Sequence, residues 1–107
     1  MTAPTDIAAA SGNDASGATP AVELPIINKR GLHARASAKF VQLVEKFDAA
    51  VSVTRNGETV GGNSIMGLMM LSAGIGTTIV VSATGPQASE AIAAITELVS
   101  SRFGEED

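Results

Sequence analysis

The residues whose types and spacing could carry out chemistry lie around the only histidine of the chain, His33. It follows Gly31 and stands at the start of a predicted helix, and Arg35 comes two positions later. The first turn of a helix presents backbone N–H groups without partners inside the helix, and the helix dipole makes that end attractive to anions. Neutral imidazole is a nucleophile and a good leaving group. The pattern therefore predicts that His33 carries a phosphoryl group, with the forked guanidinium of Arg35 binding phosphate oxygens.

Basic residues are concentrated near His33 although the chain as a whole is acidic. There are seven basic and eleven acidic residues, and five of the basic ones lie between positions 28 and 46: Lys29, Arg30, Arg35, Lys39 and Lys46. Such a cluster favours an anion-binding surface. Two plainer interpretations remain open at this point. The cluster could be a solvated helix face, and the histidine could be an ordinary surface or capping residue.

Composition argues against several other classes of protein. A net charge of −4, with three phenylalanines and no tyrosine or tryptophan, disfavours a nucleic-acid-binding protein. Without cysteine there is no disulfide, thiol nucleophile or thiolate metal site, which suits the cytoplasm. No potential metal ligands accompany His33, and neither a P-loop nor a serine-hydrolase motif is present. We therefore expect no metal, no cofactor and no self-sufficient enzyme, but chemistry that partner proteins complete.

The chain is expected to form one soluble domain that follows a tail. Its 107 residues, 45% of them hydrophobic, suit a single core. Neither a signal peptide nor an apolar run of membrane-spanning length is evident, so we expect a protein that is not exported. Residues 1–20 are mostly Ala, Ser, Thr, Gly and Pro without apolar periodicity, which predicts a disordered tail. Residues 21–107 should be the folded domain.

Apolar periodicity and turn residues predict the elements that position His33. Strands are predicted where apolar residues alternate or β-branched residues cluster, at 22–26, 51–53, 58–61 and 77–83. Helices are predicted where apolar residues recur at helical spacing, at about 33–47, 64–71 and 86–99. Asn56-Gly57 indicates a hairpin turn, and Pro86 suits the first turn of the last helix. The order β-α-β-β-α-β-α predicts an α+β fold, with three helices on one face of a four-stranded, mainly antiparallel sheet.

These motifs together carry a family resemblance. The stretch GLHARASAKFVQLVEKF, followed by NSIMGLMML and by the glycine-rich residues before TTIVVSATG, resembles the HPr family of phosphocarrier proteins of the phosphoenolpyruvate-dependent phosphotransferase system. The resemblance covers nearly all of residues 21–107. It implies an open-faced β-sandwich, phosphorylation of His33 at Nδ1 by Enzyme I, assistance from Arg35, and onward transfer to an EIIA-type acceptor. The family usually has proline where this chain has Ala36, which should leave the helix start slightly less pre-organised without abolishing function.

Finer features resemble the nitrogen-related NPr branch of that family. They are the stretch INKRGLHAR, the segment Phe47–Ala49, the run ATGPQ at Ala83–Gln87 and the ending FGEED. Membership of this branch implies regulatory acceptors, including an EIIA of the nitrogen type, more than sugar transport. A small carrier that must dock on two partners in turn is most simply a monomer.

Ser64 is a second candidate site. Its position before the apolar SIMGLMML segment predicts a helix N-cap. The resemblance implies in addition a regulatory serine that an HPr kinase/phosphorylase phosphorylates. The two roles are compatible because a phosphate is electrostatically tolerated at a helix N-terminus, where it would act by blocking the docking of partners.

The apolar residues after Ser64 have two possible roles. Five large residues of this short helix resemble the surface through which HPr proteins meet their partners: Ile65, Met66, Leu68, Met69 and Met70. The competing interpretation is plain core. Because five large residues of so short a helix cannot all face inward, we expect one or two to be exposed. We predict that these are Met66 and Met69, with Ile65 also belonging to the partner-binding surface.

Two other classes of function remain as alternatives to a phosphocarrier. One is a small hydrolase such as an acylphosphatase, which would turn over acyl phosphate without partners. The other is a ligand-binding regulatory domain in which His33 is incidental and replaceable. A phosphatase assay on the isolated protein separates the first alternative, and a His33→Ala variant separates the second.

Overall fold

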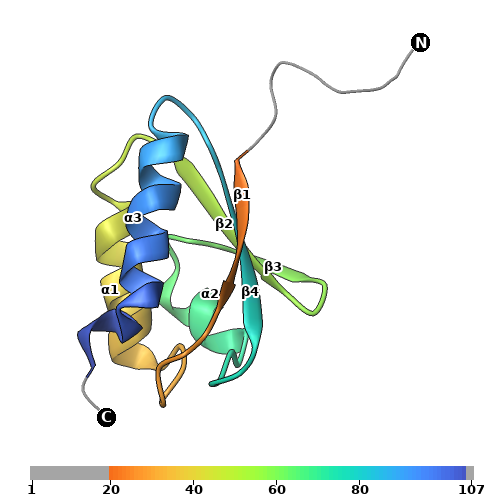
Figure 1. Cartoon of the computed structure of the whole chain (residues 1–107). Helices are drawn as coiled ribbons and strands as arrows, with labels where there is room; N and C mark the ends of the chain where they lie inside the picture. Colours follow the sequence, from red (N-terminus) through yellow and green to blue (C-terminus); the bar gives the residue numbers. More distant parts are fainter. Residues whose placement is uncertain (1–19, 106–107) are drawn as a thin grey trace.

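The computed structural model describes residues 20–105, which form one sheet covered by helices (Figure 1). Its elements in chain order are β1 (Ala21–Pro25), α1 (Ala34–Val44), β2 (Ala50–Arg55), β3 (Glu58–Gly61), α2 (Ile65–Met70), β4 (Thr78–Thr84) and α3 (Ala88–Ser100). The predicted order β-α-β-β-α-β-α is confirmed. A single 3-10 turn, η1 (Arg102–Gly104), follows α3.

The sheet has the strand order β1-β4-β2-β3, and all three pairs of neighbours are antiparallel. Val81 of β4 lies opposite Val22 of β1 and Val53 of β2. Figure 1 shows α1 and α3 side by side over one face of the sheet, with α2 lying across its lower end. The predicted α+β fold with three helices on one face is therefore confirmed.

The core lies between that face of the sheet and the helices. Its largest apolar side chains are almost completely removed from solvent: Ile26, Phe40, Val53, Leu68, Ile79, Val81, Ile95, Val99 and Phe103. Full burial of a side chain of this size contributes about 1.5–3 kcal/mol. Every element contributes to a single cluster, β3 only through the partly buried Val60, and the loop residue Leu32 just before the histidine belongs to it as well.

Two predicted helix boundaries were wrong. The first helix ends at Val44, not at Phe47, because the amides of Lys46 and Phe47 donate to carbonyls only three residues back and tighten the last turn. Pro86 precedes the last helix instead of opening it, since its N-cap Gln87 is not helical and donates its N–H to the Asp48 carbonyl at 3.0 Å. The spacing of apolar residues alone does not reveal hydrogen bonds of this kind at the ends of helices.

The hairpin that joins β2 and β3 turns where it was predicted. Asn56 and Gly57 both have positive φ angles, 52° and 81°. Two such residues in succession match the right-handed twist of the flanking strands, which is why Asn-Gly favours this turn.

Two sequence-based expectations concern the ends of the chain and the membrane. The predicted tail, residues 1–20, lies outside the described residues except for Pro20, so it stays a prediction. Across residues 20–105, every helix is too short or too polar to cross a lipid bilayer.

Candidate functional site

Gly31 shapes the loop that carries the histidine. It has a φ angle of +65°, and a Cβ atom at this position would lie 2.3 Å from the carbonyl oxygen of Ala73. The next residue, Leu32, is buried and donates its N–H to the same oxygen at 2.9 Å. Glycine is therefore required for two reasons, the left-handed backbone and the close approach of the segment that follows α2. The contact with the Ala73 carbonyl holds the loop in place, and α1 begins directly after it.

Replacing Gly31 with alanine is expected to lower the free energy of unfolding by at least about 2 kcal/mol, because the positive φ angle and the steric clash add. Gly57→Ala is the matched control, since Gly57 also has a positive φ angle but a Cβ there would meet nothing within 4 Å. It should cost only about 1 kcal/mol. Denaturant unfolding of both variants measures the difference, and equal losses would show that the approach to Ala73 carries no energetic weight.

His33 occupies the N-cap position of α1. Its backbone is extended, with φ −75° and ψ −178°, and its carbonyl accepts the first helical hydrogen bond from the Ser37 N–H at 2.8 Å. The imidazole caps none of the helix amides and is 23% exposed. The N–H groups of Ala34, Arg35 and Ala36 belong to the first turn, where amides lack helical acceptors. Ala36 is buried in the core and the helix begins before it, so the missing proline does not delay the helix start.

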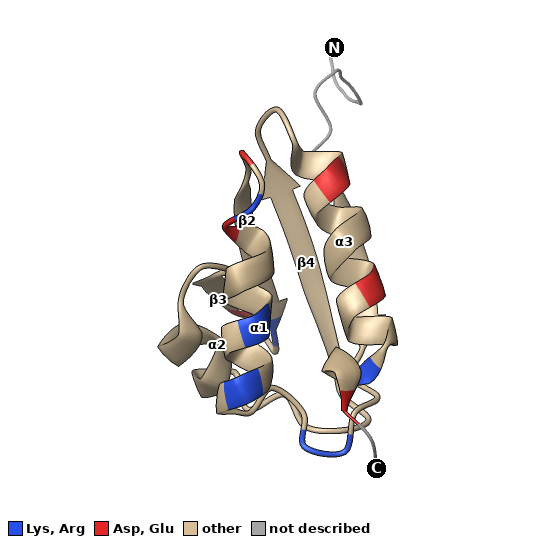
Figure 2. Cartoon of the chain, turned by 90° about the vertical axis from the view of Figure 1, so that its left-hand side faces the viewer, with Lys and Arg blue, Asp and Glu red and all other residues tan. Residues whose placement is uncertain are grey.

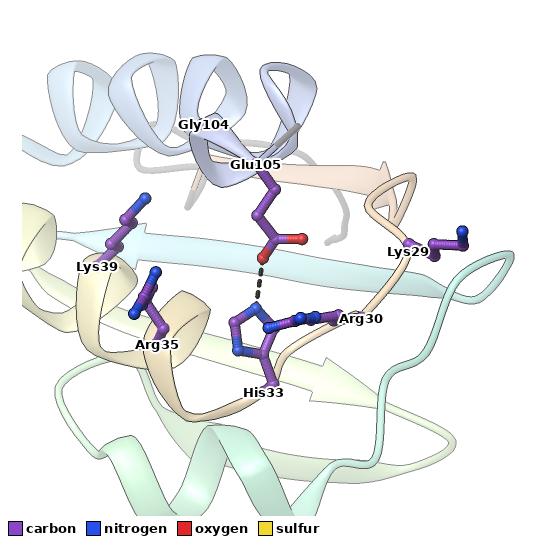
Figure 3. Close-up of a pocket in the computed structure, with 7 residues that line it drawn as sticks. All are labelled: Lys29, Arg30, His33, Arg35, Lys39, Gly104 and Glu105. Atoms are coloured by element: carbon purple, nitrogen blue, oxygen red, sulfur yellow. Dashed lines mark hydrogen bonds and ion pairs between the residues drawn. The ribbon is translucent and has the colours of Figure 1, made fainter. Parts of the chain in front are cut away.

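A pocket of about 480 Å³ opens beside the imidazole. It is lined by residues of the loop, the start of α1 and the C-terminal end: Lys29, Arg30, His33, Arg35, Lys39, Gly104 and Glu105 (Figure 3). Figure 2 shows most lysine and arginine positions of the ribbon at this end of the molecule, with acidic positions along α3. The structure thus brings four of the five clustered basic residues to the pocket. Lys46, beyond the other end of α1, does not line it.

Glu105 is the residue of this site that the sequence analysis missed. Its Oε2 contacts the Nε2 atom of His33, and Figure 3 shows its side chain reaching from the C-terminal segment to the ring. The buried Asn28 also donates to both carboxylate oxygens, at 3.2 and 3.3 Å. A separation of 72 residues hides this pairing from any local pattern. The acidic ending FGEED was visible in the sequence, but only as a family feature.

The C-terminal turn is held over α1 by two contacts. Phe103 is buried in the core, and its backbone has a positive φ angle of 55°, which turns the chain back toward His33. Lys39 of α1 donates from Nζ to the carbonyl oxygen of Phe103 at 2.6 Å. These contacts hold the backbone in place two residues before Glu105. The carboxylate therefore extends to the imidazole from a backbone segment that is packed against the core.

The pKa of Glu105 is lowered from its ordinary value of 4.5. Burial of the carboxyl group acts in the opposite direction and raises the pKa, but hydrogen bonds from His33 and Asn28 and the positive charges of His33 and Arg30 together outweigh it. The carboxylate is therefore ionised at neutral pH and places a negative charge at the edge of a basic pocket.

This shift predicts a pH-dependent contribution to stability. A carboxyl group with a lowered pKa in the folded state stabilises the fold above its unfolded pKa, and the contribution is lost as the pH falls through the folded value. The free energy of unfolding of the natural chain should exceed that of Glu105→Gln near neutral pH, and the difference should shrink between about pH 5 and pH 3. Denaturant titrations across this range test it, and a constant difference would contradict the assignment.

Ser64 caps α2, as predicted. Its Oγ accepts a hydrogen bond from the Gly67 N–H at 3.0 Å, and the side chain is half-buried. Removal of such a cap costs about 1 kcal/mol. Ser64 does not line the His33 pocket.

The apolar residues of α2 are more exposed than expected. We define the α2 apolar patch as Ile65, Met66, Met69 and Met70, all of which are exposed, whereas Leu68 is buried. Met66 and Met69 are exposed as predicted, but the expectation of one or two exposed residues was wrong, and Met70, the most exposed at 70%, was missed. With only six residues, α2 makes fewer than two turns and directs a single large side chain into the core.

The α2 segment and the histidine lie on one continuous surface. A second, shallower hollow of about 250 Å³ is lined by Arg30, Leu32 and His33 on one side and by Ser72–Gly74, directly after α2, on the other. The residues that directly follow α2 therefore lie beside the imidazole. An imidazole in a basic pocket, together with an exposed apolar patch, is the arrangement expected of the class of small carriers that hold a phosphoryl group on histidine and exchange it with other proteins.

Comparison with known proteins identifies the family. Residues 20–101 match the family model described as the PTS HPr component phosphorylation site. The chain is 54% identical over 80 residues to the phosphocarrier protein HPr of Cupriavidus necator, which covers 75% of this chain and 90% of that protein. It is 39% identical over 83 residues to the phosphocarrier protein NPr of Shewanella violacea, covering 78% and 91%. The crystal structure of HPr-C-His from Thermoanaerobacter tengcongensis superposes with a TM-score of 0.79 at 42% identity, covering 82% and 99%.

This chain belongs to the HPr family, the phosphocarrier proteins of the phosphotransferase system. Such proteins receive a phosphoryl group on histidine from Enzyme I and pass it to an EIIA protein. They are carriers and not enzymes in their own right. The predicted family and function are therefore confirmed, and the hydrolase and regulatory-domain alternatives are set aside.

Proposed function

We propose that His33 is the residue that carries the phosphoryl group, that the bond forms at Nδ1, and that Arg35 stabilises the phosphate. The observation that carries this proposal is the pocket of about 480 Å³ in which the only imidazole of the chain meets four cationic side chains. The Arg35 side chain is exposed at the pocket rim, so it can turn toward the phosphate of an incoming partner.

The transfer is a reversible displacement at phosphorus. The lone pair of Nδ1 attacks the phosphorus atom, the N–P bond forms, and the bond to the donor breaks with its electron pair returning to the donor. The first-turn amides of α1 and the guanidinium of Arg35 offset the charge on the phosphate oxygens. Delivery to EIIA is the same displacement with His33 as the leaving group.

Phosphoryl transfer from labelled phosphoenolpyruvate through Enzyme I tests this function. The natural chain should acquire an acid-labile, base-stable label, as expected of a phosphoramidate, and should lose it when unlabelled EIIA is added. Mass spectrometry of the labelled protein should place the phosphate on the peptide that contains His33. Label on any other peptide, or none when Enzyme I itself is labelled, would overturn the proposal.

The α2 apolar patch is the surface on which we place both partners. Met66, with 68% of its surface exposed, and Met69 and Ile65 beside it offer apolar contact area without a fixed shape, which suits successive partners. Met66→Ser should reduce the rate of phosphoryl uptake at limiting Enzyme I about three- to tenfold. Ala93→Ser, which also introduces a serine but on the exposed side of α3, is the control and should leave the rate unchanged.

Ser64 is proposed as a second phosphorylation site, the target of an HPr kinase/phosphorylase. Its Oγ is half-buried and engaged with Gly67, so phosphorylation must exchange that neutral hydrogen bond for a charged one at the same helix end. A phosphate there would border the α2 apolar patch and hinder docking. Kinase labelling of the natural chain and of Ser64→Ala tests this, and equal labelling of both would exclude Ser64.

We assign the carrier to the nitrogen-related branch, which serves regulatory acceptors, and expect it to act as a cytoplasmic monomer. The motifs INKRGLHAR, ATGPQ and FGEED support this finer assignment. Competition between a nitrogen-type and a sugar-type EIIA for the labelled chain decides it. Faster transfer to the sugar-type protein would place the chain with the HPr carriers of sugar transport.

A further inference from the structure

Asn28 is a fully buried polar residue next to the pocket. Its side chain is 0% exposed, and its Nδ2 donates to the Gly31 carbonyl at 2.8 Å as well as to Glu105. Its Oδ1 accepts no hydrogen bond from the residues that the structure describes. Native proteins seldom leave a buried amide oxygen unpaired, because its desolvation costs free energy. The unpaired Oδ1 of Asn28 therefore calls for an explanation.

Chemistry fixes which way the Asn28 amide faces. Both of its neighbours, the Gly31 carbonyl and the Glu105 carboxylate, can only accept hydrogen bonds, so the NH₂ group must point toward them. The unpaired Oδ1 is the consequence of this orientation. Asn28 thus links the Gly31 carbonyl to the Glu105 carboxylate by hydrogen bonds, at the point where the chain turns toward His33.

Glu105 faces the imidazole as an ionised acceptor. It is 17% exposed, and besides Asn28 it contacts Nε2 of His33. An ionised carboxylate accepts hydrogen bonds and donates none, so the Nε2 atom must carry the proton in this contact. Neutral imidazole has one N–H and one lone pair, and the lone pair is then on Nδ1.

We propose that Glu105, held by Asn28, is a positioning residue that keeps the imidazole proton on Nε2 and leaves the Nδ1 lone pair free for the phosphoryl group. This inference rests on the proposed role of His33 and deepens it. It explains why a buried amide with an unpaired oxygen stands at this position, and why the C-terminal segment is anchored by Phe103 and Lys39.

The atoms balance without any proton transfer. When Nδ1 bonds to phosphorus, the proton on Nε2 stays in place, and the positive charge that develops on the ring is met by the carboxylate of Glu105. When the phosphoryl group leaves, the electron pair returns to Nδ1 and the ring is again neutral. The side chains of Lys29, Arg30, Arg35 and Lys39 line the same pocket and offset the repulsion between the carboxylate and the phosphate.

The test compares four variants of the full chain with the natural protein. Glu105→Leu removes the acceptor, Glu105→Gln keeps a carbonyl acceptor without the charge, and Asn28→Ala removes the amide that holds Glu105. Glu90→Gln makes the same charge change at the exposed start of α3 and is the control. Two-bond ¹H–¹⁵N correlation spectra of the unphosphorylated proteins, recorded under the same conditions for all, report which ring nitrogen carries the proton.

We expect the natural chain, Glu105→Gln and the control to show a ring protonated on Nε2 alone. Glu105→Leu should show a mixture of both tautomers and take up the phosphoryl group about tenfold more slowly. Asn28→Ala should shift the ring in the same direction as Glu105→Leu. Thermal unfolding of each variant establishes that it is folded.

An unchanged ring spectrum in Glu105→Leu, or phosphoryl uptake at the rate of the control, would overturn the role of Glu105. An unchanged spectrum in Asn28→Ala would remove Asn28 from the proposal. These spectra are recorded without phosphorylation. A natural chain that takes up no label would therefore refute the proposed function while the spectra still decide the role of Glu105.

Discussion

His33→Ala is expected to abolish phosphoryl uptake from Enzyme I, with the label falling at least about a thousandfold, because it removes the proposed covalent acceptor. The imidazole is the only one in the chain, so no second ring can take over. The fold should persist, since the His33 side chain caps no helix amide and lies at the surface. The free energy of unfolding should fall by less than about 1 kcal/mol. Transfer of label and a denaturant titration of the same preparation measure both effects.

Lys46→Ala is a suitable control for this experiment. Lys46 follows the same helix and carries a positive charge, but it does not line the pocket. Its replacement should leave phosphoryl uptake within about twofold of the natural chain, because exposed charges beyond a Debye length are largely screened. Acid-labile label that persists on His33→Ala would show that the acceptor is another residue and would end the present assignment.

Phe103→Ala is expected to cost about 3–5 kcal/mol of unfolding free energy, the largest stability loss that we predict. The ring is fully buried against the core, and the surrounding helices cannot close the resulting cavity completely. For a domain of this size such a loss lowers the melting temperature by more than about 10 °C. The variant should also release the C-terminal turn and with it the contact between Glu105 and His33.

Phe47→Ala removes the same side chain from a half-buried position after α1, and is the matched control. Its cost should be no more than about half that of Phe103→Ala, because fewer contacts and less apolar area are lost. Thermal and denaturant unfolding of both variants measure the ratio. A melting temperature of Phe103→Ala close to that of the natural chain would mean that the C-terminal turn is not part of the cooperative core.

The exposure of α2 illustrates a feature that local pattern predicts only in part. The segment is apolar at nearly every position, so its helical character and its N-cap Ser64 could be predicted from sequence. How many of its side chains reach the core depends on how closely the other helices approach. Here only Leu68 is buried, and Met70 is exposed to solvent as Met66 and Met69 are.

The sequence by itself determined the order of the elements, the α+β class, the Asn56-Gly57 turn and the choice of His33 as the proposed phosphoryl acceptor. These features depend on short-range chemistry, that is, on side-chain periodicity, turn dihedral angles and a nucleophile beside a helix start. The tertiary structure alone decided that Glu105 meets the imidazole, that Asn28 donates to Glu105, and that Lys46 stays away from the pocket. The physical reason is distance along the chain, because contacts between residues 72 or 77 positions apart exist only once Phe103 is packed into the core.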